Sequence, residues 1–173
     1  MRLFHVSEEA GIEVFYPRIP ARNDLDRSVG LVWAIDEDRL PNFLTPRDCP
    51  RVAYSIGRNT AEADKKAFFT SASVRHAVII EHNWFQRMKD TTLYLYEFDT
   101  SGFELQDEIA GYYISKTPQV PIAKHQVTDL FAELMIRNVE VRMVDSLWDI
   151  ADAVKASTLN WSLCRMKNAR PGS

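Results

Sequence analysis

The sequence predicts an α+β domain in which mixed or antiparallel β-sheets are flanked by short helices. Predicted strands outnumber predicted helices, and strand–helix–strand units alternate with consecutive strands. The 173 residues are 46% hydrophobic and 11% aromatic, which is enough for a sizeable core in about one domain. No internal repeat, low-complexity segment or linker divides the sequence. We therefore expect residues 1–173 to form a single domain, with a loose tail from about residue 165.

The individual elements follow from apolar periodicity between turn signals. One central sheet is predicted to contain the β-branched and aromatic strands at residues 3–6, 29–35, 75–81 and 92–98. Shorter strands are predicted at residues 51–56, 103–105, 111–115, 120–127 and 139–144. Helices are predicted at residues 37–44, 61–69, 83–89, 129–138 and 147–156. The expected core includes Trp33, Ile79, Leu95, Leu134 and Ile150.

Composition excludes several functional classes. A net charge of −3 provides no global basic field, so nucleic acid is not indicated as a partner. The apolar runs are far too short for a membrane span, and acids near the N-terminus exclude a signal peptide. We expect a soluble, cytoplasmic protein. Its two cysteines, Cys49 and Cys164, form no Cys/His ligand cluster, so no metal is expected, and no glycine-rich phosphate loop is present.

Residues 29–52 are the strongest candidate for a binding site. An apolar strand runs into an acidic turn and a short helix, and a PRDCPR segment follows. Guanidinium groups on such a proline-bracketed loop suit a phosphate or a carboxylate, which makes Arg47 and Arg51 candidate ligand-binding residues. The structural alternative is a cluster of these two arginines with Asp48.

A second arginine-rich segment lies at residues 17–27. It is polar and lacks periodicity, and it has the length of functional loops. It carries three arginines after Pro17, which are Arg18, Arg22 and Arg27.

Three further residue types have a functional and a structural interpretation. His5 lies in an apolar strand, and it is either a core histidine bonded to backbone or a donor facing a ligand. Cys49 could be a nucleophile if the neighbouring arginines lower its pKa, although no histidine is placed by the sequence as its base. Carboxylates near strand ends, including Glu108, could bond sugar hydroxyls or stabilise a cation, but surface solvation is the alternative for each.

Six segments spread over nearly the whole chain resemble a family of small uncharacterised bacterial proteins, for which no activity is known. These segments are LFHVSEE, GLVWAID, PRDCPRV, LYLYEFD, AGYY and NWSLCRM.

A second, remote resemblance is to ADP-ribosyltransferases. LFHVS resembles their first strand, which bears a histidine, and so places His5. GLVWAIDEDRLPNF resembles the strand and short helix that follow, with Trp33 or Val32 at the strand aromatic and Phe43 at the stacking position. LYLYEFD and DEIAGYYISKTPQVPI resemble the closing strands, and Glu108 is the best candidate for the acid. Three features depart from the pattern: Val6 replaces a glycine, the family's tyrosine has no clear match, and the acid aligns alternatively with Gly111 or Tyr112, which are not acidic.

This resemblance implies that NAD is a substrate and that the chain is a transferase. His5 would hold a ribose hydroxyl and Glu108 would stabilise the ribose cation, as the catalytic pair. Cofactor-binding residues would be Trp33, Phe43, Arg18, Arg22, Arg47 and Arg51. The acceptor stays open. One alternative is a non-catalytic nucleotide-binding or protein-interaction module of the same fold, and another is a hydrolase that uses Cys49 or a carboxylate pair.

Overall fold

The computed structural model describes residues 1–172, and within them ten strands form two sheets beside four short α-helices. This arrangement confirms the predicted α+β class. The chain divides into two compact units, which are described separately. The first contains Met1–Leu40 and Leu93–Val127, and the second contains Pro41–Thr92 and the chain from Thr128 onward. Within residues 1–172, no helix is long and apolar enough to cross a membrane.

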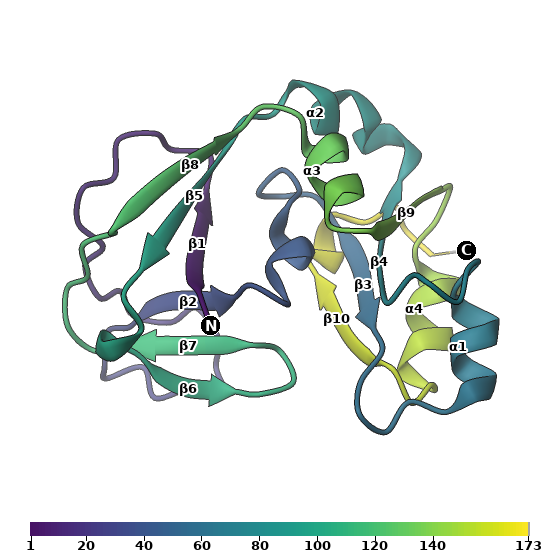
Figure 1. Cartoon of the computed structure of the whole chain (residues 1–173), viewed down its shortest axis with the longest axis horizontal. Coiled ribbons are helices and arrows are strands. Elements are labelled where there is room, and N and C mark those ends of the chain that lie inside the picture. Colours follow the sequence, from purple (N-terminus) through teal and green to yellow (C-terminus); the bar gives the residue numbers. More distant parts are fainter. Residues whose placement is uncertain (173) are drawn as a thin grey trace. The chain divides into compact units, whose positions relative to one another are not determined.

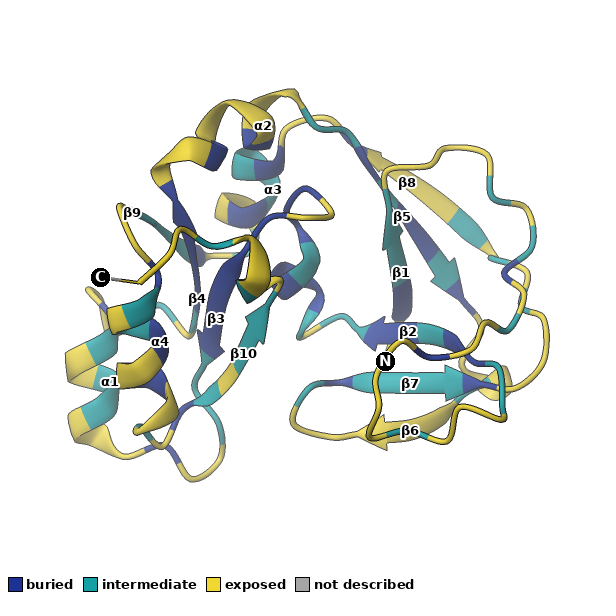
Figure 2. Ribbon diagram, turned by 180° about the vertical axis from the view of Figure 1, so that it is seen from behind, coloured by how far each residue is buried: buried dark blue, intermediate teal, exposed yellow. Residues whose placement is uncertain are grey.

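The first unit is a six-stranded antiparallel sheet with the order β6-β7-β2-β1-β5-β8 (Figure 1). β1 and β2 pair directly, and β7 pairs with the other side of β2. The turn after β5 contains the 3-10 helix η3 (Thr100–Gly102). β6 is exposed along its whole length at one edge of the sheet (Figure 2). The strands are β1 (Leu3–Ser7), β2 (Val32–Asp36), β5 (Leu93–Phe98), β6 (Glu104–Asp107), β7 (Tyr112–Ser115) and β8 (Ala123–Val127).

Alternation along these strands gives the sheet two distinct faces, because successive side chains point to opposite sides. Leu3 is opposite Asp36, and Phe4 is opposite Ile35. We call the side with Leu3 and His5 the His5 face and the other side the Trp33 face. A buried cluster on the His5 face contains Leu3, Phe15, Val32, Ala34, Tyr96 and Phe98.

The second unit contains a four-stranded sheet with the order β10-β3-β4-β9, in which only the β4–β9 pair is parallel. Its strands are β3 (Arg51–Ser55), β4 (His76–Glu81), β9 (Val139–Val144) and β10 (Asn160–Cys164). Its helices are α1 (Glu62–Phe68), α2 (Phe85–Asp90), α3 (Leu130–Ile136) and α4 (Trp148–Lys155), with the 3-10 turns η2 (His82–Trp84) and η4 (Met166–Asn168).

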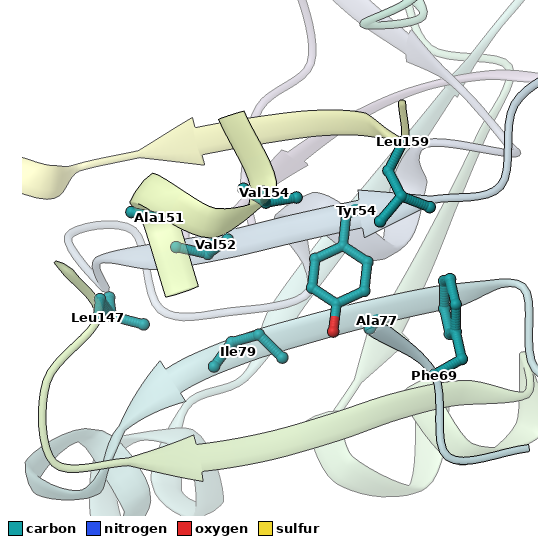
Figure 3. Close-up of a cluster of buried hydrophobic side chains, with 9 residues drawn as sticks. All are labelled: Val52, Tyr54, Phe69, Ala77, Ile79, Leu147, Ala151, Val154 and Leu159. Atoms are coloured by element: carbon teal, nitrogen blue, oxygen red, sulfur yellow. The ribbon is translucent and has the colours of Figure 1, made fainter. Parts of the chain in front are cut away.

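The core of the second unit forms where α4 packs on this sheet. Ala151 and Val154 of α4, together with Leu147 just before the helix, cluster with Val52 and Ile79 of the sheet (Figure 3). The remaining members of the cluster are Tyr54, Phe69, Ala77 and Leu159. The Tyr54 hydroxyl donates to the Phe68 carbonyl over 2.8 Å, so its polar end is satisfied inside the core.

The structure corrects several sequence expectations. The strand predicted at residues 75–81 forms, but not in the sheet that contains the other three, because it pairs with β3 and β9. The helix predicted at residues 37–44 is a turn followed by the 3-10 helix η1 (Leu40–Phe43), since Pro41 has no backbone N–H to donate. Ile79, Leu95 and Leu134 are buried as predicted, whereas Trp33 and Ile150 are only half-buried.

The segment predicted as a loose tail makes specific contacts. The backbone N–H of Arg170 donates to both carboxylate oxygens of the buried Glu81, over 3.0 and 3.1 Å. The Trp148 indole N–H donates to the Arg170 carbonyl over 2.6 Å, and the Asn168 amide donates to the Asp48 carbonyl over 2.8 Å. The final residue of the predicted tail, Ser173, lies outside the described residues.

Candidate functional site

His5 is held against the neighbouring strand β2. Its Nδ1 lies 3.0 Å from the carbonyl oxygen of Trp33, and its ring centroid lies 4.8 Å from that of Phe15. Because a carbonyl oxygen can only accept, Nδ1 is the donor in this contact. The half-buried His5 therefore makes a backbone contact of the kind expected for a core histidine.

Arg39 connects the end of β2 to the turn that contains Glu108. Its backbone N–H donates to Oδ1 of Asp36 over 2.8 Å. Its guanidinium donates to the carbonyls of Ile109 and Glu108, over 3.2 and 3.4 Å. The Asp36 N–H also donates to the Gly111 carbonyl over 3.0 Å. These contacts fix the backbone of residues 108–111 beside the end of β2.

The Glu108 carboxylate itself is in a different situation from its backbone. The residue is exposed, and among residues 1–172 its carboxylate has no hydrogen bond or ion pair. The structure thus positions the Glu108 carbonyl and leaves the predicted catalytic carboxylate at the surface.

Trp33 and His5 lie on opposite faces of the sheet, although they are on adjacent strands. The Trp33 ring packs edge-on against Tyr112, with centroids 5.6 Å apart and an interplanar angle of 84°. Val32, the alternative to Trp33 for the strand position, belongs to the buried cluster on the His5 face. The structure therefore brings Val32, and not Trp33, to the side of the sheet that carries His5.

The two candidate arginines of the 17–27 segment are both exposed. Arg22 forms an ion pair with Asp24, with Nη2 2.6 Å from Oδ2, and this hydrogen bond is the main reason that the pKa of Arg22 is raised. Arg18 is anchored by its backbone, since its N–H and carbonyl both pair with Leu31 over 3.0 and 2.8 Å. The start of the segment is thus tied to the chain just before β2.

Phe43, Arg47 and Arg51 lie in the second unit. Arg51 is buried and donates to the Asn42 carbonyl over 2.9 Å and to the Cys49 carbonyl over 3.0 Å. Its guanidinium carbon also lies 5.3 Å from the centroid of the Phe43 ring. These contacts match the structural interpretation of Arg51, although its partners are carbonyls and not the predicted Asp48. Arg47 is exposed.

Cys49 does not have the environment of a nucleophile. It is fully buried, and this burial raises the pKa of its thiol to about 12, against the opposing effect of Arg51 and Arg87. At neutral pH the thiol therefore stays protonated, and the thiolate that a hydrolase would need is absent. The arginines do act to lower the pKa of Cys49, but desolvation is the larger effect, so the net shift is upward and the conditions for a nucleophile are not met.

An ionic cluster that the sequence does not predict lies on the Trp33 face. Arg2 donates to both oxygens of Glu97, over 2.9 and 2.8 Å, and His125 Nε2 lies 3.1 Å from one of them. The Arg2 hydrogen bonds are the main reason that the pKa of Glu97 falls to about 2. These groups come together because the β1–β5 register sets Phe4 opposite Glu97. No local pattern in the sequence predicts this register. Glu97 is accordingly engaged in holding β1, β5 and β8 together.

Metal ligands are not grouped in the part of the chain that the structure describes: within residues 1–172, no three His, Cys, Asp or Glu side chains could hold an ion together.

Comparison with known proteins identifies a family but no characterised relative. A family model described as a family of unknown function (DUF6886) matches residues 4–169. No curated protein and no solved structure matches the chain. The matched range includes residues of both compact units and nearly the whole chain. The chain therefore belongs to the family of unknown function DUF6886.

Proposed function

We propose that the first unit binds NAD on its His5 face and slowly cleaves the nicotinamide–ribose bond, as the resemblance to ADP-ribosyltransferases implies. One observation carries the proposal. β2 is flanked by the strand that bears His5 and by the strand that follows Glu108. The histidine and the acidic turn, which are far apart in the sequence, are thus attached to one strand.

The chemistry requires three kinds of group. The His5 imidazole would hold a ribose hydroxyl, and the Trp33 carbonyl supports this role by fixing the ring. An arginine of the 17–27 segment, Arg18 or Arg22, would meet the diphosphate. A carboxylate at the end of β2 or in the adjoining turn would stabilise positive charge on the ribose, where an interaction made mainly in the transition state accelerates the reaction.

Calorimetry with NAD, followed by chromatographic detection of nicotinamide, tests this proposal. The wild type should bind NAD and release nicotinamide. His5→Ala should bind NAD roughly 3–10-fold more weakly, the effect of losing about one hydrogen bond. His82→Ala is the matched control, because His82 also contacts a backbone carbonyl, that of Met143, over 3.0 Å, but it is exposed and lies in the second unit. No heat of binding at millimolar NAD would overturn the proposal.

A non-catalytic nucleotide-binding module is the second candidate. The solvent-facing carboxylate of Glu108 favours it, because an acid in bulk water stabilises a nearby cation weakly. Binding of NAD by the wild type with no nicotinamide release over days would identify this alternative.

A further inference from the structure

We propose that Asp36, and not Glu108, is the carboxylate that acts on a ligand of the His5 face. This inference rests on the proposed function and names a catalytic residue for it. The carboxylates of the first unit include Asp36 at the end of β2, Glu97 in β5 and Glu108 in the turn before β7.

The strand register places Asp36 on the same face as His5. Asp36 is directly opposite Leu3, and His5 is two residues further along β1. The two residues are therefore diagonal neighbours, whose Cα atoms lie about 7–8 Å apart in an antiparallel pair. Glu97 is on the opposite face and is already paired with Arg2 and His125.

Gly111 shows where the Asp36 carboxylate lies relative to β7. A Cβ atom built on Gly111 would be 2.7 Å from Oδ2 of Asp36, closer than real Cβ contacts come. The carboxylate thus occupies the space that a side chain at the entrance to β7 would fill. Glycine at this position leaves room for an acid supplied by the neighbouring strand.

Arg39 contacts this carboxylate through a backbone hydrogen bond and a longer ion pair. Oδ1 accepts from the backbone N–H of Arg39 over 2.8 Å, and the Arg39 guanidinium lies 3.8 Å from Oδ2. The Asp36 side chain is 16% exposed, so it is partly desolvated and still reachable. Burial raises its pKa, a perturbation that is common at functional sites.

The reaction assigned to this group is hydrolysis of NAD. The bond between ribose C1′ and the nicotinamide nitrogen breaks, and its electron pair leaves with neutral nicotinamide. The Asp36 carboxylate stabilises the positive charge that develops on the ribose and is not consumed. Water then adds to C1′ and loses a proton, which gives ADP-ribose and H⁺.

Conservative substitutions of Asp36 test whether its negative charge is needed for nicotinamide release. Asp36→Asn keeps an oxygen for the Arg39 N–H but removes the charge, so nicotinamide release should fall by roughly 10²–10³-fold while NAD binding is nearly unchanged. Asp36→Glu keeps the charge and should release nicotinamide faster than Asp36→Asn. Asp38→Asn is the control that should match the wild type, because Asp38 also lies 3.8 Å from Arg39 but is 87% exposed.

The outcomes distinguish this inference from the proposed function. Wild type that binds NAD, with release lost in Asp36→Asn and largely kept in Glu108→Gln, supports Asp36. Release lost in Glu108→Gln and kept in Asp36→Asn overturns the inference and leaves the proposed function standing. Binding without any release overturns the catalytic role of Asp36 and leaves a binding module. No heat with NAD on the wild type overturns both.

Discussion

His5 Nδ1 lies 3.0 Å from the Trp33 carbonyl oxygen, yet the two side chains lie on opposite faces of the same sheet. Successive side chains of a β-strand point to opposite faces of the sheet, so His5 can contact the Trp33 carbonyl while the Trp33 ring lies on the other face. The residues of β2 that share the face of His5 are Val32, Ala34 and Asp36, and because Val32 and Ala34 are buried, Asp36 is the one that a ligand beside His5 could reach.

The fixed turn beside Asp36 should make Gly111 intolerant of any side chain. Its φ of +68° is strained for other residues, and an added Cβ would meet the Asp36 carboxylate. We expect Gly111→Ala to lower the free energy of unfolding by about 1–3 kcal/mol in urea titrations. Gly11→Ala is the matched control, because nothing lies within 4 Å of a Cβ at that position. Equal effects of the two substitutions would contradict the assigned turn.

The sequence predicts most elements of both units, because burial on one face leaves a periodic trace. Such local signals predict the strands found at Leu3–Ser7 and Leu93–Phe98 and the helix that Asp129 caps. Sheet membership is different, since β4 has the same apolar composition as its predicted neighbours but pairs with β3 and β9. Pairing partners are fixed by contacts between distant segments, which one sequence does not encode locally.

The candidate site was predictable only in part for a related reason. His5 could be singled out because a histidine interrupts an apolar strand. Asp36 was foreseen only as a helix cap, and its proximity to Gly111 depends on the register between β2 and β7. Arg51 had the composition of a ligand-binding residue, but burial directs its donors to the carbonyls of Asn42 and Cys49.

Leu134 should be among the most sensitive core positions of the second unit. It is fully buried on α3, so Leu134→Ala should leave a cavity and lower the free energy of unfolding by about 2–5 kcal/mol. Met135 is the next residue of the same helix but is 66% exposed, and Met135→Ala should change stability by less than about 0.5 kcal/mol. Chemical denaturation of both variants checks the helix face, and a reversed order would show that it is misassigned.

The Arg2–Glu97 pair should make stability fall in acid. Glu97 has a lowered pKa of about 2, so its contribution is present above the pKa that it has when unfolded, and it disappears as the pH falls through about 2. Exposure of Arg2 screens the interaction, and we expect about 1 kcal/mol. Urea titrations between pH 6 and pH 2 should give Glu97→Gln a flatter profile than the wild type. Glu104→Gln, on the exposed strand β6, should keep the wild-type profile.

The two cysteines should differ in their reactivity. Cys49 is fully buried with a pKa raised to about 12, whereas Cys164 is half-buried on β10. Iodoacetamide at neutral pH should therefore modify Cys164 first, and Cys49 should react only after denaturant is added. Peptide mass spectrometry over time measures both rates. Early modification of Cys49 in the native protein would revive the cysteine-hydrolase alternative.

We expect the negative charge of Asp36 to lower the free energy of unfolding at neutral pH, and variants of Asp36 test this. Burial raises the pKa of Asp36 in the folded state, so the ionised form destabilises the fold at neutral pH. This penalty should vanish as the pH falls below the pKa of the unfolded residue, where Asp36 is protonated in both states. Arg39 and Asp38 are the charged neighbours that act on it, with opposite signs, and burial outweighs Arg39. Asp36→Asn should accordingly be at least as stable as the wild type at pH 7, with any advantage shrinking in acid.

Asp36→Ala removes the oxygen that accepts from the Arg39 N–H, and its free energy of unfolding should fall by about 0.5–2 kcal/mol, the usual effect of losing a side-chain cap. Urea titrations of both variants at pH 7 and pH 3 measure these differences, and a large loss for Asp36→Asn at pH 7 would mean that the charge serves the fold.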